Sequence, residues 1–288
     1  MEKVAATSEK SMIPEFCLTF SPNWYLPQIL SISEEGLLAY GANADVYVID
    51  LLKRSFVTSV RCILKSGNEN KSKVTAVLSR MHLLFAGFAD GTLCIWNEKL
   101  NYEFIKSASF PGKEILNIAE GPKFKENIDL YLGFRGGEVV RYSLETQNVC
   151  KEPEGDPLFL RTVTIEDKQV LLAVFSSGTV LIFSDSNNLL FKWESKAKLF
   201  NAAEPLTAKN CITLLLLTKK NVAILLQINA KTAEGSLQFE ITKEYRKNFA
   251  FEKNVKHKDD PEYLKAQPNI HFLNPSNVKH YFCLYTYI

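Results

Sequence analysis

Short apolar runs, each broken by a tight turn, recur along most of this chain. Five stretches share one form, in which an apolar run, a short turn and a second apolar run follow one another: "LLAYGANADVYVID" (37–50), "LLFAGFADGTLCIWN" (83–97), "LYLGFRGGEVVRYS" (130–143), "LLAVFSSGTVLIFS" (171–184) and "LLLLTKKNVAILLQ" (214–227). When their turn residues Ala44, Gly91, Gly137, Gly178 and Asn221 are aligned, the intervals are 47, 46, 41 and 43 residues. Runs rich in Val, Ile, Leu and Phe predict β-strands. A strand hairpin that recurs at this spacing predicts a repeat architecture.

The turns and the runs beside them predict how each hairpin is packed. Asp90-Gly91, Gly136-Gly137 and Ser177-Gly178 suit a tight hairpin turn, because glycine adopts positive φ without steric cost. The following runs, such as "TLCIW" (92–96) and "TVLIF" (179–183), are apolar at consecutive positions. A strand that is apolar on both faces is expected to lie between two neighbouring layers.

The repeat length is typical of one kind of β-protein. A period of about 40–45 residues with four strands per unit is the spacing of a WD40 propeller blade. "ADGTLCIWN" (89–97) resembles the end of the second strand, the turn and the third strand of such a blade, with Trp96-Asn97 in the Trp-Asp position. The other copies carry Ile49-Asp50, Tyr142-Ser143 and Phe183-Ser184 there, and no Gly-His pair precedes them. We therefore predict an all-β WD40-type propeller, with an unrelated β-sandwich as the alternative.

The predicted propeller is incomplete. One more interval from Asn221 falls near residue 264, in the polar stretch "KHKDDPEYLKAQPN" (256–269), and an apolar strand returns only at "HYFCLYTYI" (280–288). This gives five hairpin repeats and part of a sixth, with a polar N-terminal arm over 1–20 and the propeller over 21–288. Either an N-terminal strand completes the sixth blade or the chain is part of a longer protein, and the pattern favours the second interpretation.

Composition limits how the protein can bind nucleic acid. The net charge is +2 with 23% charged residues, so binding would have to come from a local patch or from stacking. The basic run over 243–258 could contact phosphates, but a solvated loop between blades is the favoured interpretation.

Cysteine usage and hydropathy indicate the compartment. None of the six cysteines forms a C-x-x-C pair, which predicts free thiols in a reducing environment. The first thirteen residues lack the apolar core of a signal peptide. The longest apolar run is cut by Lys219 and Lys220, so it is not expected to span a membrane. We therefore expect a soluble intracellular protein with no membrane contact.

No residue pattern indicates catalysis. The four histidines never stand at metal or catalytic spacing, and no Ser, Cys or carboxylate constellation stands out. The glycines of "GFRGGE" (133–138) fit a hairpin turn, since a phosphate-binding loop requires a Lys-Ser/Thr pair and a following helix. We expect no enzyme activity, no metal, no cofactor and no small-molecule substrate.

An aromatic pair near the N-terminus is the candidate site. Trp24 and Tyr25 stand side by side in "SPNWY" (21–25), between Pro22 and Pro27. Their rings could fill a core in a strand that closes the propeller. Alternatively, the prolines hold the stretch extended and the two rings stack with the bases of a single-stranded nucleic acid.

A family resemblance favours the second interpretation. "SPNWY", ten residues, and then "GLLAYGANADVYVID" (36–50) resemble the opening of the Gem-associated protein 5 family, the RNA-binding WD40 subunits of the SMN complex. The resemblance implies that Trp24 and Tyr25 contact the uridine-rich Sm site of small nuclear RNA precursors. It also implies other SMN-complex proteins as partners, a role in spliceosomal snRNP assembly and mRNA splicing, and a location in the cytoplasm and in nuclear bodies.

The match to this family is partial. An arginine that the family uses after the Gly-Leu strand falls at Asn43 here, which weakens the phosphate part of the site. The aromatics with which the family binds the RNA cap have no counterpart that aligns.

A second resemblance leads to a different function. "GLLAYGANADVYVIDLLKRSFVTSV" (36–60) is also similar to the first blade of Elongator complex subunit 2, a scaffold for tRNA modification. That resemblance implies a protein-interaction scaffold without RNA binding. Because that family lacks "SPNWY", the pentapeptide discriminates between the two.

Overall fold

The structure is a computed structural model, and almost every residue that it describes in a regular element lies in a β-strand. It describes residues 22–23, 26–63, 67, 69–124, 128–143, 146–150, 155–202, 205–220, 222–233, 236–248, 269–273 and 281–285. The one described helix is a short 3-10 turn, η1 (Glu98–Leu100).

The strands form six antiparallel sheets, which we call blades 1 to 6. Blade 1 contains β1 (Leu30–Ile32), β2 (Leu37–Ala42), β3 (Asp45–Asp50) and β4 (Ser55–Arg61). Blade 2 contains β5 (Val74–Arg80), β6 (Leu83–Phe88), β7 (Thr92–Asn97) and β8 (Glu103–Ser109). Blade 3 contains β9 (Ile115–Glu120), β10 (Leu130–Phe134), β11 (Val139–Tyr142) and β12 (Thr146–Cys150).

The remaining three blades follow in chain order. Blade 4 contains β13 (Pro157–Ile165), β14 (Lys168–Phe175), β15 (Thr179–Ser184) and β16 (Leu189–Glu194). In blade 5, both β17 (Leu199–Ala202) and β18 (Leu206–Ala208) pair with β19 (Cys211–Thr218), which is followed by β20 (Val222–Ala233) and β21 (Ser236–Asn248). Blade 6 contains β22 (Asn269–Leu273) and β23 (Tyr281–Tyr285).

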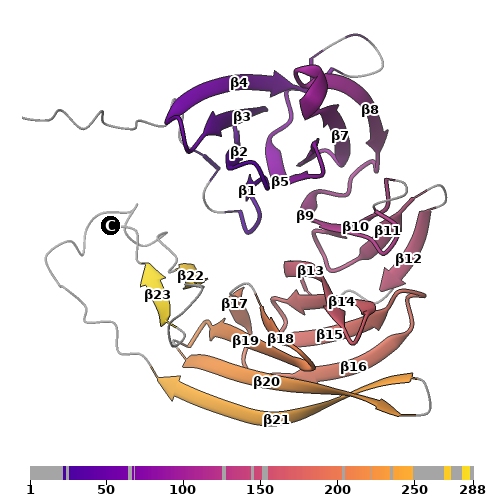
Figure 1. Ribbon diagram of the computed structural model, residues 1–288, viewed down its shortest axis with the longest axis vertical. Helices are drawn as coiled ribbons and strands as arrows, with labels where there is room; N and C mark the ends of the chain where they lie inside the picture. Colours follow the sequence, from indigo (N-terminus) through magenta and orange to yellow (C-terminus); the bar gives the residue numbers. More distant parts are fainter. Residues whose placement is uncertain are drawn as a thin grey trace, which may run out of the picture.

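The blades are arranged radially. The first strand of each blade contacts the first strand of the next, from β1 through β5, β9, β13 and β17 to β22. Figure 1 shows the blades following one another around a common centre, in chain order. The fold is therefore a β-propeller, as the hairpin spacing predicts, and the alternative of a β-sandwich is wrong.

The predicted hairpins are the second and third strands of each blade. The turns between β2 and β3, β6 and β7, β10 and β11, and β14 and β15 contain Ala44, Gly91, Gly137 and Gly178 as predicted. The fifth predicted turn residue, Asn221, lies outside the described residues, between β19 and β20. The positive φ expected of the turn glycines is found at Gly91 (86°), Gly137 (104°) and Gly178 (106°).

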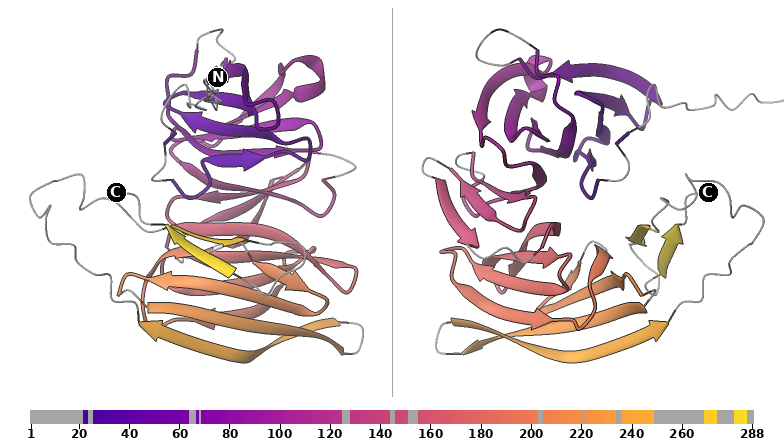
Figure 2. Two further views of the ribbon diagram at one scale, coloured as in Figure 1. Left: turned by 60° about the vertical axis from the view of Figure 1, so that its left-hand side comes forward. Right: turned by 180° about the vertical axis from the view of Figure 1, so that it is seen from behind.

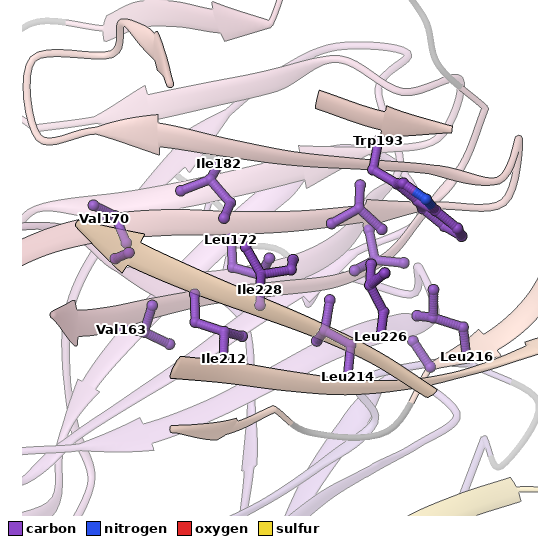
Figure 3. Close-up of a cluster of buried hydrophobic side chains, with 14 of the residues drawn as sticks. Val163, Val170, Leu172, Ile182, Trp193, Ile212, Leu214, Leu216, Leu226 and Ile228 are labelled. Carbon is purple, nitrogen blue, oxygen red and sulfur yellow. The ribbon is translucent and has the colours of Figure 1, made fainter. Parts of the chain in front are cut away.

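Alternate residues along a central strand pack on different neighbours. In β14, Val170, Leu172 and Val174 join a core cluster with blade 5, whereas Leu171, Ala173 and Phe175 join one with blade 3. Figure 3 shows the first cluster, with Val163, Val170, Leu172, Ile182 and Trp193 of blade 4 facing Ile212, Leu214, Leu216, Leu226 and Ile228 of blade 5. Burying one such aliphatic side chain contributes about 1.5–3 kcal/mol, so these clusters dominate the stability of the array.

The degenerate Trp-Asp positions retain a structural role. At three of them the side chain accepts a backbone N–H from the following turn: Leu52 and Lys53 donate to Asp50 (3.0 and 2.8 Å), Lys99 to Asn97 (3.0 Å) and Asn188 to Ser184 (3.1 Å). The hydrogen bond from the Lys53 N–H, above all, holds the pKa of Asp50 below its ordinary value. These three blades therefore share a side-chain acceptor for the N–H groups of the following turn, although only blade 1 has an aspartate at this position.

Side chains also join different blades near the centre. The Gln28 amide donates to the Ile118 carbonyl and accepts from the Ile118 N–H, both at 2.7 Å, so it ties the segment before β1 to blade 3. The Ser79 N–H donates to the Ser31 hydroxyl at 3.0 Å and thereby joins blade 2 to blade 1.

The sixth blade is smaller than the others. Within the described residues it has two strands, and it shares no sheet with blade 1. Figure 1 and the right panel of Figure 2 show these two blades on either side of an opening in the array. The propeller is therefore incomplete in the described part of the chain. The polar arm over 1–20 lies outside it.

Three expectations for individual segments are wrong. Residues 243–248 belong to β21, the outermost strand of blade 5, and not to a loop. A strand at 269–273, β22, precedes the predicted strand near the C-terminus, because a short apolar run inside a polar stretch pairs with β23. Cys62 and Cys94 form a disulfide between blades 1 and 2 (Cα–Cα 6.2 Å), since the fold brings together residues that are 32 apart in sequence. Cys211 carries a free thiol.

We expect Gly91→Ala to destabilise the protein more than Gly112→Ala. Both glycines have positive φ (86° and 73°), so alanine at either position incurs about 1–2 kcal/mol of backbone strain. A Cβ at Gly91 would lie 2.0 Å from the Phe110 carbonyl oxygen, whereas at Gly112 it would meet no atom within 4 Å. The steric clash should add about 1–3 kcal/mol. Urea unfolding of both variants measures the difference, and equal losses would contradict the packing described here.

Candidate nucleic-acid interface

The blades present two faces, which differ in the loops they carry. In an antiparallel four-stranded blade, the turn between the second and third strands lies at the same end as the loop to the next blade. We call this end of the array the hairpin face, formed by residues 43–44, 89–91, 135–138, 176–178 and 219–220 and by the loops between blades. The left panel of Figure 2 shows the blades from the side, with their turns at the two ends of the strands.

The predicted stacking residues, Trp24 and Tyr25, lie outside the described residues, but the residues on both sides of them are described. Asn23 is 6% exposed and is fixed on both its backbone and its side chain. Its N–H donates to the Gly41 carbonyl (2.9 Å), and its side-chain amide donates to the Val74 carbonyl (2.9 Å). Its own carbonyl accepts the Leu26 N–H (3.0 Å). Asn23 therefore fixes the start of the candidate stretch at the junction of blades 1 and 2.

Sequence reasoning missed Asn23, although it lies inside the pentapeptide. The signal that could have revealed it is its type, because a short amide side chain supplies both a donor and an acceptor. Here the acceptor receives the Asn43 N–H (3.2 Å), so one side chain joins the turn of blade 1 to the strand that opens blade 2.

Asn43 has a structural role in this turn. It adopts a left-handed conformation (φ 52°), which asparagine tolerates better than most residues. Its carbonyl accepts the Val74 N–H at 2.8 Å. Asn43, at the position where the sequence resemblance expected an arginine, therefore supports Asn23 and β5 through hydrogen bonds.

Arg61, the last residue of β4 in blade 1, is already paired. Arg61 donates to both oxygens of Asp45 (2.5 and 2.6 Å) and to Glu69 (2.6 Å). The hydrogen bonds that Arg61 donates, first to Asp45 and then to Glu69, raise the pKa of Arg61 above its ordinary value. Two carboxylates neutralise this cation, so Arg61 is a poor candidate for binding a phosphate.

A second ion-paired cluster lies on the hairpin face at blades 3 and 4. Arg135 donates to Glu114 and to Asp156, and the hydrogen bond to Glu114 raises the pKa of Arg135. Lys113 pairs with Glu138 at 2.6 Å. This part of the hairpin face is therefore close to neutral.

The opposite face carries a cavity of about 560 Å³ where blades 4 and 5 meet. Asp167, Gln169 and Asp185 are among its lining residues. Within the described ranges, no three His, Cys, Asp or Glu side chains group so that they could hold a metal ion. The described part of the chain also contains no helix with the length and apolar character needed to cross a membrane.

Comparisons with known proteins identify the fold. No protein-family model matches the chain, and no curated protein matches it. A chain in a crystal structure of the mitotic checkpoint complex aligns with a TM-score of 0.54 and 11% identity, over 85% of this chain and 89% of that one. The Dos1 propeller aligns with a TM-score of 0.56 and 10% identity, over 76% of this chain and 60% of that one. At these identities the likeness shows a WD40-type propeller fold and nothing more.

We expect Asn23→Ala to destabilise the protein by about 1–3 kcal/mol, because buried backbone groups lose their partners. Asn23→Asp should cost at least as much, since a carboxylate cannot donate to the Val74 carbonyl that lies 2.9 Å from the amide nitrogen. As a control, Asn188→Ala removes an exposed amide and should change stability by less than about 0.5 kcal/mol. Thermal unfolding of the three variants tests this, and an Asn23→Ala protein as stable as its parent would show that Asn23 is no anchor.

Proposed function

We propose that this protein is a WD40-type scaffold that binds single-stranded, uridine-rich RNA on its hairpin face. In the cell its RNA would be small nuclear RNA precursors, and its partners would be the other proteins of the SMN complex, in the cytoplasm and in nuclear bodies. The proposal extends the resemblance of "SPNWY" and residues 36–50 to the Gem-associated protein 5 family.

One observation carries the proposal. The hydrogen bonds of Asn23 to Gly41, Asn43 and Val74 fix the residue immediately before Trp24 on the hairpin face. A stretch held at a defined point can present two adjacent aromatic rings with little loss of conformational entropy on binding. Flat rings that stack on successive bases contribute about 1–3 kcal/mol per base.

The recognition would rest on stacking more than on arginine contacts. Arg61 and Arg135, two described arginines at the hairpin-face end of their blades, are both held by carboxylates. Stacking alone tolerates any base, so a preference for uridine requires hydrogen bonds to the base edges in addition.

A protein-interaction scaffold of the Elongator type is the second candidate. The observation that favours it is a group of exposed apolar side chains on blade 1, Leu30 (52%), Ile32 (49%) and Phe56 (53%). Exposed apolar groups of this kind often mark a surface that another protein covers.

The test is a double substitution, Trp24→Ala with Tyr25→Ala, measured by binding to a uridine-rich RNA and to a scrambled RNA. If each aromatic ring stacks on one base, the double variant should lose about 2–6 kcal/mol of binding free energy for the uridine-rich RNA. Phe56→Ala with Tyr245→Ala is the matched control, because it removes two exposed aromatic side chains elsewhere and should leave binding unchanged.

The stability of the double variant distinguishes the two interpretations of the pair. Removing one aromatic side chain from a core destabilises a protein by about 3–5 kcal/mol. If the pair instead stacks on RNA, the double substitution should destabilise the protein by much less. If the double variant binds both RNAs as its parent does but unfolds at a far lower temperature, the two residues belong to the core and the proposed function is wrong.

A further inference from the structure

Four lysines gather on the hairpin face where blade 4 meets blade 5. Lys196 and Lys198 lie in the loop from β16 to β17, and Lys219 and Lys220 lie in the turn after β19. The two segments are about twenty residues apart in sequence, yet the Lys219 N–H donates to the Lys198 carbonyl at 2.9 Å. We call these four residues the lysine patch.

Backbone hydrogen bonds hold the loop of the patch at both ends. The Ser195 N–H donates to the Gly178 carbonyl (2.8 Å), and the Leu199 N–H donates to the Ser176 carbonyl (3.1 Å). Both acceptors belong to the β14–β15 turn. The second segment is held through Thr218, whose hydroxyl accepts the Lys220 N–H at 3.3 Å. The lysines are therefore presented from fixed backbone positions.

The patch is a concentration of uncompensated positive charge. All four side chains are exposed, and none has an ion pair within the described part of the chain. The nearest carboxylate in sequence, Glu194, pairs with Lys192 at 2.7 Å. Arg61, Arg135 and Lys113 on the same face all have carboxylate partners. Since the chain carries only +2 overall, this local excess of positive charge stands out.

We infer that the lysine patch binds the phosphate backbone of the RNA whose bases stack near Asn23. This inference rests on the proposed function, and it assigns the phosphate contacts that Asn43 and the paired arginines do not supply. Exposed ammonium groups bind phosphates as point charges and read no sequence. Blade 1 would then supply the preference for uridine, and the lysine patch on blades 4 and 5 would supply the part of the affinity that depends on charge.

Salt dependence of binding measures the phosphate contacts directly. For single-stranded nucleic acid, the slope of log K against log salt concentration changes by about 0.7 for each phosphate that the protein no longer neutralises. We expect the variant with all four lysines replaced, K196Q/K198Q/K219Q/K220Q, to lower that slope by up to about 3. At low salt its affinity should fall by at least about tenfold for the uridine-rich and the scrambled RNA alike.

The matched control is K99Q/K123Q. Both lysines are exposed and have no ion pair in the described residues, but they lie in turns of the opposite face. This variant should keep the parent's slope and affinity. Circular dichroism and thermal unfolding of the four-lysine variant should match the parent, because exposed lysines contribute little to stability.

The possible results separate this inference from the proposed function. If the full chain binds neither RNA, the proposed function fails. If it binds RNA and the four-lysine variant keeps both slope and affinity, the inference about the patch is wrong and the proposed function stands. If the four-lysine variant loses binding to polyglutamate but keeps its RNA affinity, the patch serves an acidic protein partner and the inference is overturned.

Discussion

Packing of one sheet face against the next is the interaction on which this structure depends. Four core clusters join blades 1 to 5 in sequence, and each draws on alternate residues of the central strands. A central strand must therefore be apolar on both of its faces, which is why its residues appear in the sequence as an unbroken apolar run. Gly41 and Gly87 show how closely the blades approach, since a Cβ at either position would lie 2.5 Å from a side chain that opens the next blade. Loops at the ends of the strands are free of this constraint, so they can carry function.

The hairpins could be predicted because their signal is local. Turn glycines and apolar runs stand next to each other in the sequence, and the structure places each described turn where the repeat indicates. The features that were missed depend on contacts between distant residues. Cys62 and Cys94 pair because two blades pack together, and the two halves of the lysine patch meet through a hydrogen bond between loops. The outer strand β21 was missed because its exposed, charged residues carry no apolar pattern.

The candidate site shows the same division between local and distant information. The sequence singled out Trp24 and Tyr25 but not Asn23, whose importance comes from partners 18 to 51 residues away. The sequence also indicated that the basic run over 243–258 could contact phosphates, although a solvated loop between blades was the favoured interpretation. In the structure Arg246 pairs with Glu244 on β21, whereas the four lysines of the patch, which have no ion pair in the described residues, lie in loops of the hairpin face. Charge counted along the sequence did not reveal which cations have partners.

The central claim is that RNA lies across the hairpin face of this propeller. Photo-crosslinking of the full chain to a uridine-rich RNA that carries 4-thiouridine, followed by mass spectrometry of the crosslinked peptides, tests it most directly. The account predicts crosslinks in the peptides that contain Trp24 and Tyr25, and in those that contain residues 195–199 and 219–220. Crosslinks confined to the opposite face, for example to peptides that line the cavity near Asp167 and Asp185, would contradict it.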